Sequence, residues 1–324
     1  MNKKYLFRLV AAVAVVFVVT VVTTISVIMM KSNNLQGKLV FASTYDNGEN
    51  VDKIVIITAE DVIELNQNDS FWTVKNKDGY FADFTYIHKL LTSINTSVYS
   101  IKLPFDDDLV KEKYLVNPEV EKENSGMLIK TYVGDELLDE LLVGLSDDEK
   151  RYFYARTMQD DIWLIDGQFD LPITSEGWLL KPILSISKGS VESINIGENY
   201  IRRSVKNGDF FDEKGVKVST LMLENLLSGI NAFSAMKEEN FKKQNLTIKK
   251  EKIIEVETFY GLKFILNFYV DENNIGWINI KLSKTPLPIA LVNDYIRDNS
   301  FLYDGWFFAL YPTHTRILEN FNLI

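Results

Sequence analysis

The chain has 324 residues, no cysteine and a formal net charge of −10 at pH 7. The lack of cysteine excludes disulfide bridges, thiolate metal sites and a cysteine nucleophile. The acidic balance disfavours nucleic acid and anionic lipid headgroups as main partners, because their phosphates repel a negative surface. A chain of this length is instead stabilised by a hydrophobic core.

The first informative segment is the apolar run Leu9–Met30, whose polar members are threonine and serine. A helix of this length is about 33 Å long, enough to cross a hydrocarbon core of about 30 Å. Lys3, Lys4 and Arg8 precede the run, and cations at this position keep a short N-terminus in the cytoplasm. The run predicts a single-pass protein of the cytoplasmic (inner) membrane, with the bulk of the chain extracytoplasmic.

A cleaved signal peptide is the alternative interpretation of this run. Its apolar region is normally about 7–15 residues long and ends at a site of small residues. Here the run is longer, and its exit at residues 28–32 reads Ile-Met-Met-Lys-Ser. We therefore expect an uncleaved signal-anchor over residues 1–30. The run carries no ionisable residue, so we interpret it as a tether and not as a transport path.

A weak internal repeat suggests two tandem units. Five segments recur in the same order: Val51–Ile56 with Val191–Ile196, Asn68–Trp72 with Asn207–Phe211, Leu90–Asn95 with Leu226–Asn231, Thr131–Gly134 with Thr258–Gly261, and Tyr152–Ala155 with Trp306–Ala309. The repeat predicts a first unit over residues 51–187 and a second over 188–324. Residues 31–50, rich in Ser, Asn and Gly, are then expected to form a short stalk.

The first unit is expected to begin with β-rich strands over residues 51–57 and 62–65 and a third near the Phe-Trp pair at 71–72. A helix follows, with Asp83 as its N-cap and an apolar stripe made of Phe84, Ile87, Leu90, Leu91 and Ile94. Antiparallel strands over 127–133 and 137–144 flank a Gly-Asp turn, and a hairpin joins 152–156 to 162–166. Residues 137–142 carry good helix formers, but the short length favours a strand.

The second unit is expected to repeat this pattern. Strands are predicted over residues 191–196, 200–205, 253–260 and 262–270, with a last hairpin joining 306–311 to 316–318. Its helix would have Ser219 as its N-cap and bear the stripe Leu223, Leu226, Leu227 and Ile230. The predicted fold class is α+β: two tandem duplicated units of mainly antiparallel strands with one principal helix each, after a single N-terminal transmembrane helix.

Several of these elements together resemble a known bacterial family. They are Ile63–Leu65, Phe71–Val74, Asp78–Asp83, Phe153–Arg156 and Ile162–Asp166. Their order and sequence are similar to the domain-of-unknown-function 4340 family, over roughly residues 50–190. The resemblance implies a membrane-anchored domain outside the cytoplasm. It also implies an association, in some members, with transporter subunits of the gliding-motility ABC type. It supplies no catalytic residues to carry over.

The candidate catalytic or metal-binding groups are two histidines and three acidic clusters. The two histidines, His88 and His314, fall at non-equivalent positions of the repeat, and we interpret both as structural. The acidic clusters at residues 106–108, 147–149 and 160–161 could attract a divalent cation but lack calcium-loop spacing, so we interpret them as solvated turns. The sequence contains no nucleophile elbow, Walker loop or dinucleotide fingerprint. We therefore predict no catalytic, cofactor-binding or metal-binding residue and no cofactor.

Trp178, between the two units, is the best single candidate for an inter-unit or binding contact, although core packing is its ordinary role. Taken together, the sequence favours a non-enzymatic extracytoplasmic interaction module with a membrane-protein partner, accessory to an ABC-type transporter or another envelope complex. The alternative is a sensor that binds envelope glycans or peptides in a groove between the units. A carboxylate-based envelope hydrolase is the third hypothesis, since paired carboxylates cannot be recognised from sequence.

Overall fold

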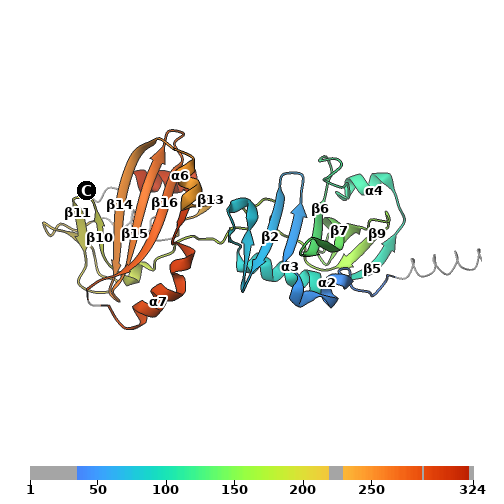
Figure 1. Ribbon diagram of the computed structural model, residues 1–324, viewed down its shortest axis with the longest axis horizontal. Helices are drawn as coiled ribbons and strands as arrows, with labels where there is room; N and C mark the ends of the chain where they lie inside the picture. Colours follow the sequence, from blue (N-terminus) through green and yellow to red (C-terminus); the bar gives the residue numbers. More distant parts are fainter. Residues whose placement is uncertain (1–34, 219–228, 287, 321–324) are drawn as a thin grey trace, which may run out of the picture.

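The computed structural model describes residues 35–218, 229–286 and 288–320. The predicted anchor, Leu9–Met30, lies outside them. Among the described residues, no helix is both long and apolar enough to cross a membrane. The protein is mainly β, with one antiparallel sheet of nine strands and another of eight. Figure 1 shows the two sheets end to end. We call residues 35–182 the first lobe and the described residues from 183 to 320 the second lobe.

The first lobe is built on the nine-stranded sheet. Along β1 (Lys53–Ile57) buried and half-buried side chains alternate, as expected where one face of a strand meets the core. The spatial order of the strands is β4 (Tyr80–Phe81), β3 (Phe71–Val74), β2 (Val62–Asn68), β1, β6 (Met127–Val133), β7 (Glu136–Ser146), β8 (Tyr152–Arg156), β9 (Ile162–Asp166) and β5 (Val98–Leu103).

Helix α3 (Phe84–Thr96) crosses the first lobe and confirms the predicted helix. Asp83 caps it, because its Oδ1 accepts a hydrogen bond from the Thr85 N–H at 2.8 Å. Ile87, Leu90 and Ile94 of the predicted stripe are buried in the core. Phe84 was wrongly assigned to this buried stripe, because it is 76% exposed.

The second lobe is built on the eight-stranded sheet. Its spatial order is β12 (Phe211–Asp212), β11 (Asn199–Arg202), β10 (Val191–Ile196), β14 (Ile248–Thr258), β15 (Leu262–Asp271), β16 (Gly276–Lys284), β17 (Trp306–Leu310) and β13 (Ala232–Lys237). The predicted helix, with Ser219 as its N-cap, falls mostly on residues outside the described ones. Ile230, the last member of its predicted stripe, is described and lies in an isolated β-bridge with Leu184 and not in a helix.

The two sheets have the same order of strands. From β3 to β5 the first sheet matches the second from β12 to β13, place for place, and β4 has no counterpart. In this order β8 corresponds to β16 and β9 to β17. The sequence pairing of Tyr152–Ala155 with Trp306–Ala309 is therefore wrong by one strand. The predicted last strand, Arg316–Leu318, is also wrong, because it lies in helix α8 (Pro312–Glu319), which begins at a proline.

The remaining helices of the described residues are short, and the described part of the chain is mainly β with few helices. They are α2 (Ala42–Asp46), α4 (Asp107–Glu112), α6 (Glu238–Lys243) and α7 (Leu291–Asn299), together with the single-turn helices η1 (Gly48–Asn50), η2 (Lys75–Lys77), η3 (Lys188–Ser190) and η4 (Ser300–Leu302).

The described part of the expected stalk packs on the first lobe. Phe41 is 0% exposed and its ring lies 6.3 Å from that of Phe169. The Gly37 N–H donates to the Tyr99 carbonyl at 2.7 Å, and the Tyr99 N–H donates to the Lys38 carbonyl at 3.0 Å, so this segment pairs with the open edge of β5. Residues 35–50 therefore differ from a free stalk and belong to the folded body.

The lobes share a packed junction. Tyr80, on β4, places its ring 4.9 Å from Trp306 and 5.1 Å from Phe308 of the second lobe, and its hydroxyl donates to the Leu302 carbonyl at 3.3 Å. Asp78 Oδ2 accepts from the Lys237 N–H at 3.0 Å. One hydrophobic cluster runs through both lobes. The strand without a counterpart, β4, thus takes part in the contact between the lobes.

Candidate functional site

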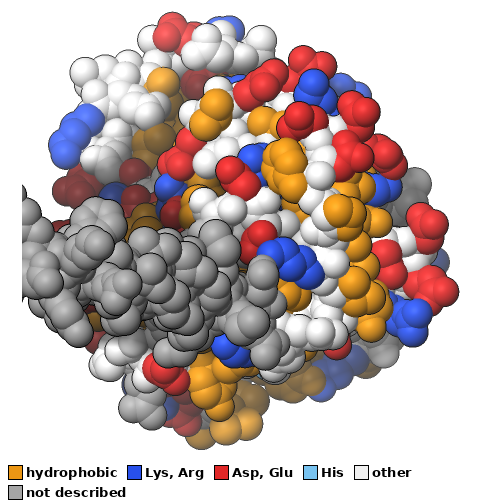
Figure 2. All heavy atoms as spheres, turned by 90° about the vertical axis from the view of Figure 1, so that its right-hand side faces the viewer, with side chains coloured by type: hydrophobic (Ala, Val, Ile, Leu, Met, Phe, Trp, Pro, Cys, Tyr) orange, Lys and Arg blue, Asp and Glu red, His pale blue; other side chains and the backbone are white. Residues whose placement is uncertain are grey.

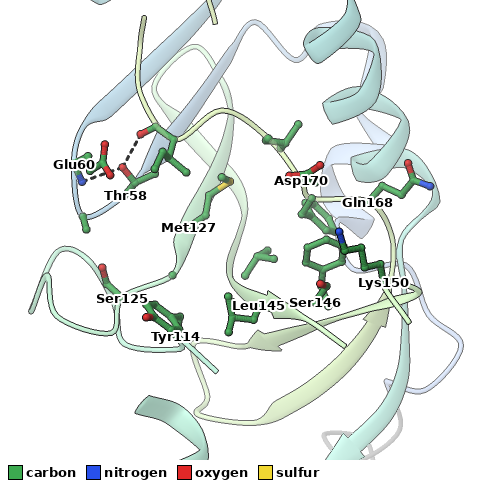
Figure 3. Close-up of a pocket in the computed structure, with 18 of the residues that line it drawn as sticks. Thr58, Glu60, Tyr114, Ser125, Met127, Leu145, Ser146, Lys150, Gln168 and Asp170 are labelled. Atoms are coloured by element: carbon green, nitrogen blue, oxygen red, sulfur yellow. Dashed lines mark hydrogen bonds between the residues drawn. The ribbon is translucent and has the colours of Figure 1, made fainter. Parts of the chain in front are cut away.

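An open cavity of about 670 Å³ lies on the first lobe (Figure 3). Its floor is apolar and buried, formed by Met127, Val143, Phe153, Phe169 and Leu171. Its rim includes the exposed side chains Tyr114, Leu145 and Ile173. A volume within about 300–1,000 Å³ and a mostly apolar lining are typical of ligand pockets. This cavity is the candidate binding site.

Backbone geometry explains why the cavity opens there. The pairing of β7 with β8 is regular up to Val143 and loses its register before Ser146. Gly144 lies in this interruption, and a Cβ at this position would come 2.1 Å from the Lys113 carbonyl oxygen. Gly126 directly precedes β6, and a Cβ at this position would come 2.4 Å from the Tyr114 carbonyl oxygen. The two glycines allow residues 113–114 to cross close over the sheet and form one wall of the cavity.

Polar contacts hold the rim on two sides. Thr58 Oγ1 donates to the Ile173 carbonyl at 2.9 Å and accepts from the Glu60 N–H at 3.2 Å. On the opposite side, Lys89 Nζ donates to the Asp170 carbonyl at 2.6 Å and lies 3.6 Å from an Asp170 carboxylate oxygen. Both rim segments are therefore tied to neighbouring structure before any ligand arrives.

Asp61, beside Thr58, also fastens this rim. Burial opposes ionisation of its carboxyl group. The N–H groups of Ser175 and Val62, each 2.8 Å from a carboxylate oxygen, outweigh burial and keep the pKa of Asp61 below its ordinary value. The ionised carboxylate links the start of β2 to the segment that carries Ile173.

A second cavity, of about 780 Å³, adjoins the first and shares Lys89, Lys150 and Gln168 with it. It lies between α3 and the start of β8 and is lined by polar groups, including His88 and Arg151. Among the described residues, Lys150 Nζ has no bonded partner. Figure 3 shows the Lys150 side chain at the edge of the first cavity. The apolar cavity thus continues into a polar one that carries a free ammonium group.

The two histidines lie in different lobes. His88 is exposed on α3, and its ring stacks on that of Phe84 at 6.1 Å. His314 is half-buried on α8, and burial lowers its pKa. The structure does not bring the two together.

The acidic clusters make local contacts. Asp106 caps α4 through the Asp108 N–H at 2.8 Å. Asp147 Oδ1 accepts from the Arg151 and Tyr152 N–H groups at 2.8 and 3.0 Å. In the third cluster, Asp160 pairs with Arg156 at 2.9 Å, and Asp161 pairs with Lys102 at 2.8 Å. In the described ranges, no three His, Asp or Glu side chains converge on a point where a metal ion could bind.

Trp178 is 0% exposed, and its ring contacts residues of the first lobe. Its Nε1 donates to the Pro172 carbonyl at 2.9 Å, and its ring lies 6.0 Å from that of Tyr86. Its neighbours reach the second lobe instead. Lys181 Nζ donates to Tyr311 Oη at 2.8 Å, and Tyr311 Oη donates to Glu176. The inter-unit contact predicted for Trp178 is therefore made by Glu176 and Lys181, which lie in the same segment.

This triad is partly shielded from water. Burial and the hydrogen bond to Glu176 raise the pKa of Tyr311, and burial lowers the pKa of Lys181. Aromatic rings and this hydrogen-bonded chain thus make the described contacts between the lobes. The candidate site lies within the first lobe and not in the predicted groove between the units.

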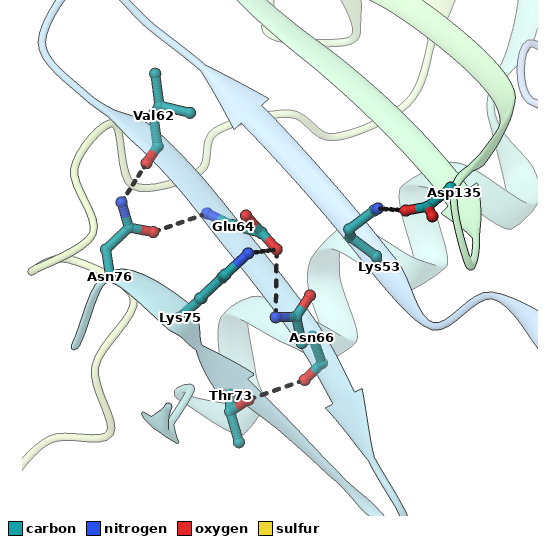
Figure 4. A network of polar contacts seen from close by, with 8 residues as sticks. All are labelled: Lys53, Val62, Glu64, Asn66, Thr73, Lys75, Asn76 and Asp135. Carbon is teal, nitrogen blue, oxygen red and sulfur yellow. Dashed lines mark hydrogen bonds and ion pairs between the residues drawn. The ribbon is translucent and has the colours of Figure 1, made fainter. Parts of the chain in front are cut away.

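A polar network secures the outer strands that carry the junction (Figure 4). Glu64 pairs with Lys75 at 2.7 Å, and Asn76 donates to the Val62 carbonyl at 2.7 Å. Thr73 Oγ1 donates to the Asn66 carbonyl at 3.1 Å. Exposed ion pairs contribute about 0–1 kcal/mol each. We interpret the network as support for the β2–β3 hairpin and hence for β4 and Tyr80.

Comparison with known proteins found no match among family models, curated proteins or solved structures. The resemblance described above therefore stays a prediction.

Proposed function

We propose that this protein is a single-pass, membrane-anchored extracytoplasmic interaction module that binds an apolar segment of a membrane-protein partner. The open apolar cavity of the first lobe carries this proposal. Its exposed rim side chains, Tyr114, Leu145 and Ile173, surround a buried apolar floor. Covering such surface stabilises a complex by about 25 cal/mol for each Å² removed from water.

The arrangement of the rim charges favours binding over hydrolysis. The rim carboxylates Glu60 and Asp170 lie on opposite sides of the cavity (Figure 3). The Asp170 carboxylate lies 3.6 Å from Lys89 Nζ. A carboxylate-based hydrolase needs two carboxyl groups that flank one bond, with one of them protonated.

The common strand order of the two sheets supports the further proposal that the chain arose by duplication of one unit. The anchor Leu9–Met30 would place both copies outside the cytoplasm. In this arrangement the protein would act beside a membrane complex, and an ABC-type transporter is the partner that the family resemblance suggests.

A sensor for envelope peptides or glycans is the second candidate. The enclosed floor of the cavity, with Phe153 and Phe169, favours it, because aromatic floors are common in sites for small ligands. For this candidate we propose the cavity of the first lobe as the ligand site, in place of a groove between the units.

In-cell photo-crosslinking tests the proposal. A photo-reactive amino acid replaces Leu145 or Ile173 in the full-length chain, and the exposed Val62 on β2 serves as the control position. We expect both rim positions to crosslink to the same membrane complex, with a reciprocal crosslink from that complex, and the control to give none. Recovery of a peptide or glycan at the rim would instead support the sensor. Equal labelling at all three positions would contradict a specific site.

A separate experiment tests the anchor. Introducing arginine in place of Val16, in the middle of the apolar run, should reduce carbonate-resistant membrane association, because a charge at the bilayer centre costs about 3 kcal/mol or more. Unchanged membrane association would contradict the predicted span.

A further inference from the structure

The described chain begins very close to the proposed anchor. Only residues 31–34 separate Met30 from Leu35. An extended chain spans about 3.5 Å per residue, so Leu35 can lie at most about 18 Å from the end of the anchor. Because residues 37–40 are hydrogen-bonded to the edge of β5, the tether holds this end of the first lobe near the membrane.

The direction of strand pairing shows which end of β5 lies toward Leu35 and the proposed anchor. Leu39 pairs antiparallel with Val98, and Gly37 bonds to Tyr99. Followed back toward Leu35, the segment therefore runs in the direction of Ile101 and the residues after β5. Figure 1 shows the second lobe at the opposite end of the molecule.

Exposed apolar side chains gather at this end. Ile101 is 47% exposed, Phe105 52% and Met158 43%. Ile101 lies opposite Leu164 across β5 and β9, and Phe105 lies against Arg156, two residues before Met158. We call Ile101, Phe105, Met158 and Leu164 the membrane-proximal band. Figure 2 views this end of the molecule and shows a band of hydrophobic side chains crossing it, with Asp and Glu along the border.

Helix α4 covers Leu103 and Ile162, which lie beside the membrane-proximal band on the same face of the sheet, and it leaves the band exposed. Leu103 and Ile162 pack with Val110 and Leu115 in a small separate core. Ile101 and Leu164 follow them at a spacing of two residues on the same face. The band is therefore the uncovered continuation of a face that the protein buries elsewhere.

The border of the band is acidic. Lys102 is paired with Asp161 at 2.8 Å and Arg156 with Asp160 at 2.9 Å. Among the described residues, Asp107 and Asp108 have no ion pair, and both lie directly after Phe105 and Asp106. An anionic lipid surface would repel this border, whereas lysine or arginine on a protein would complement it.

We infer that the membrane-proximal band docks on the extracytoplasmic face of a membrane-embedded protein that presents an apolar patch bordered by lysine or arginine. The inference rests on the proposed anchor and specifies the docking surface of the proposed interaction module. Confinement of both proteins to one membrane raises their effective concentration, so a modest apolar patch is sufficient for binding.

The test uses the full-length chain in intact cells. A photo-reactive amino acid replaces Phe105 or Met158, and matched exposed controls in the second lobe replace Val216 (60% exposed) or Leu291 (71% exposed). We expect Phe105 and Met158 to crosslink to one membrane protein and the controls to give none. The double substitution Asp107→Lys with Asp108→Lys should lower the crosslink yield about tenfold. Asp106 stays unchanged because it caps α4.

Four outcomes would overturn the inference. Crosslinks to lipid alone would assign the band to the bilayer surface. Crosslinks to the complex at Leu145 and Ile173, with none at Phe105 and Met158, would reject the band and leave the proposed function standing. A crosslink that the charge reversal does not weaken would reject the basic partner. Failure at all four first-lobe positions, in a chain that remains in the membrane, would reject both proposals.

Discussion

The two lobes share one strand order but differ at the place where the candidate site opens. In the second lobe β15 and β16 pair from Leu262–Lys284 to Val270–Gly276 without irregularity. In the first lobe the corresponding pair, β7 and β8, loses its register after Val143. The interruption and the glycine within it make room for the cavity. One topology thus supports a continuous sheet in one lobe and a binding cavity in the other, and the local backbone decides between them.

The lobes also differ in their edges. The first sheet ends in β4, which the second sheet lacks, and β4 carries the aromatic contacts of the junction. At its other edge, β5 pairs with the segment that leads to the proposed anchor. The first lobe therefore contacts the second lobe at one edge, and at the other it would face the membrane if the proposed anchor is correct.

A substitution that weakens the contact between the lobes should have the largest effect on the free energy of unfolding. We expect Tyr80→Ala to lower the free energy of unfolding by about 3–5 kcal/mol, because it removes a fully buried ring from between the lobes. We also expect it to split chemical denaturation into two transitions. Tyr80→Phe keeps the ring and loses the bond to Leu302, so it should cost about 1 kcal/mol. A single unchanged transition in Tyr80→Ala would show that the lobes do not depend on this contact.

The second prediction concerns Gly144, which lies where the pairing of β7 and β8 is interrupted. Gly144→Ala should lower stability by about 1–3 kcal/mol and reduce binding at the cavity, because its Cβ would collide with the Lys113 carbonyl oxygen. Gly48→Ala is the matched control, since no atom lies within 4 Å of its added Cβ, and it should change stability by less than about 0.5 kcal/mol. Equal effects in chemical denaturation would contradict the role of Gly144.

The hydrogen-bonded chain between the lobes should have a smaller effect. Tyr311→Phe removes the bonds to Glu176 and Lys181 and should cost about 1–2 kcal/mol at neutral pH. The raised pKa of Tyr311 keeps it protonated in the folded protein after it ionises in the unfolded chain. Folding stability should therefore fall as the pH rises above about 10, and less steeply in Tyr311→Phe. An identical alkaline slope in both proteins, measured by denaturation, would contradict this account.

A substitution at the rim of the cavity should have the smallest effect on stability. Asp61→Asn should cost about 1 kcal/mol at pH 7, because the charge accepts bonds from Ser175 and Val62. Since the pKa of Asp61 is lowered in the folded protein, this stabilisation is present above the unfolded pKa of about 4. It is lost as the pH falls through the folded pKa. Glu60→Gln, at an exposed neighbouring position, is the control and should change stability by less than about 0.5 kcal/mol at pH 7. A difference from wild type that stays constant down to pH 2 would argue against the role of Asp61.

Local patterns in the sequence predicted much of the first lobe. The strands over residues 127–133, 152–156 and 162–166 agree with β6, β8 and β9, and Asp83 caps α3 as expected. These elements were predictable because alternation, helical spacing and capping depend on neighbours in sequence. Strand β5 and strand β16 were missed, as was helix α7. Val98–Leu103 follows its helix after a single residue, without a turn signal, and only pairing with β9 defines it as a strand.

By itself, the sequence determined the apolar run, the acidic balance, the mainly antiparallel pattern and most of the order in which segments recur. The tertiary structure alone decided which strands correspond between the lobes, and it moved the expected inter-unit contact from Trp178 to Tyr80 and Tyr311. It also placed the cavity where two glycines let distant backbone segments approach. The physical reason is range: periodicity and capping act over a few residues, whereas register, burial and close backbone approach depend on which distant segments meet.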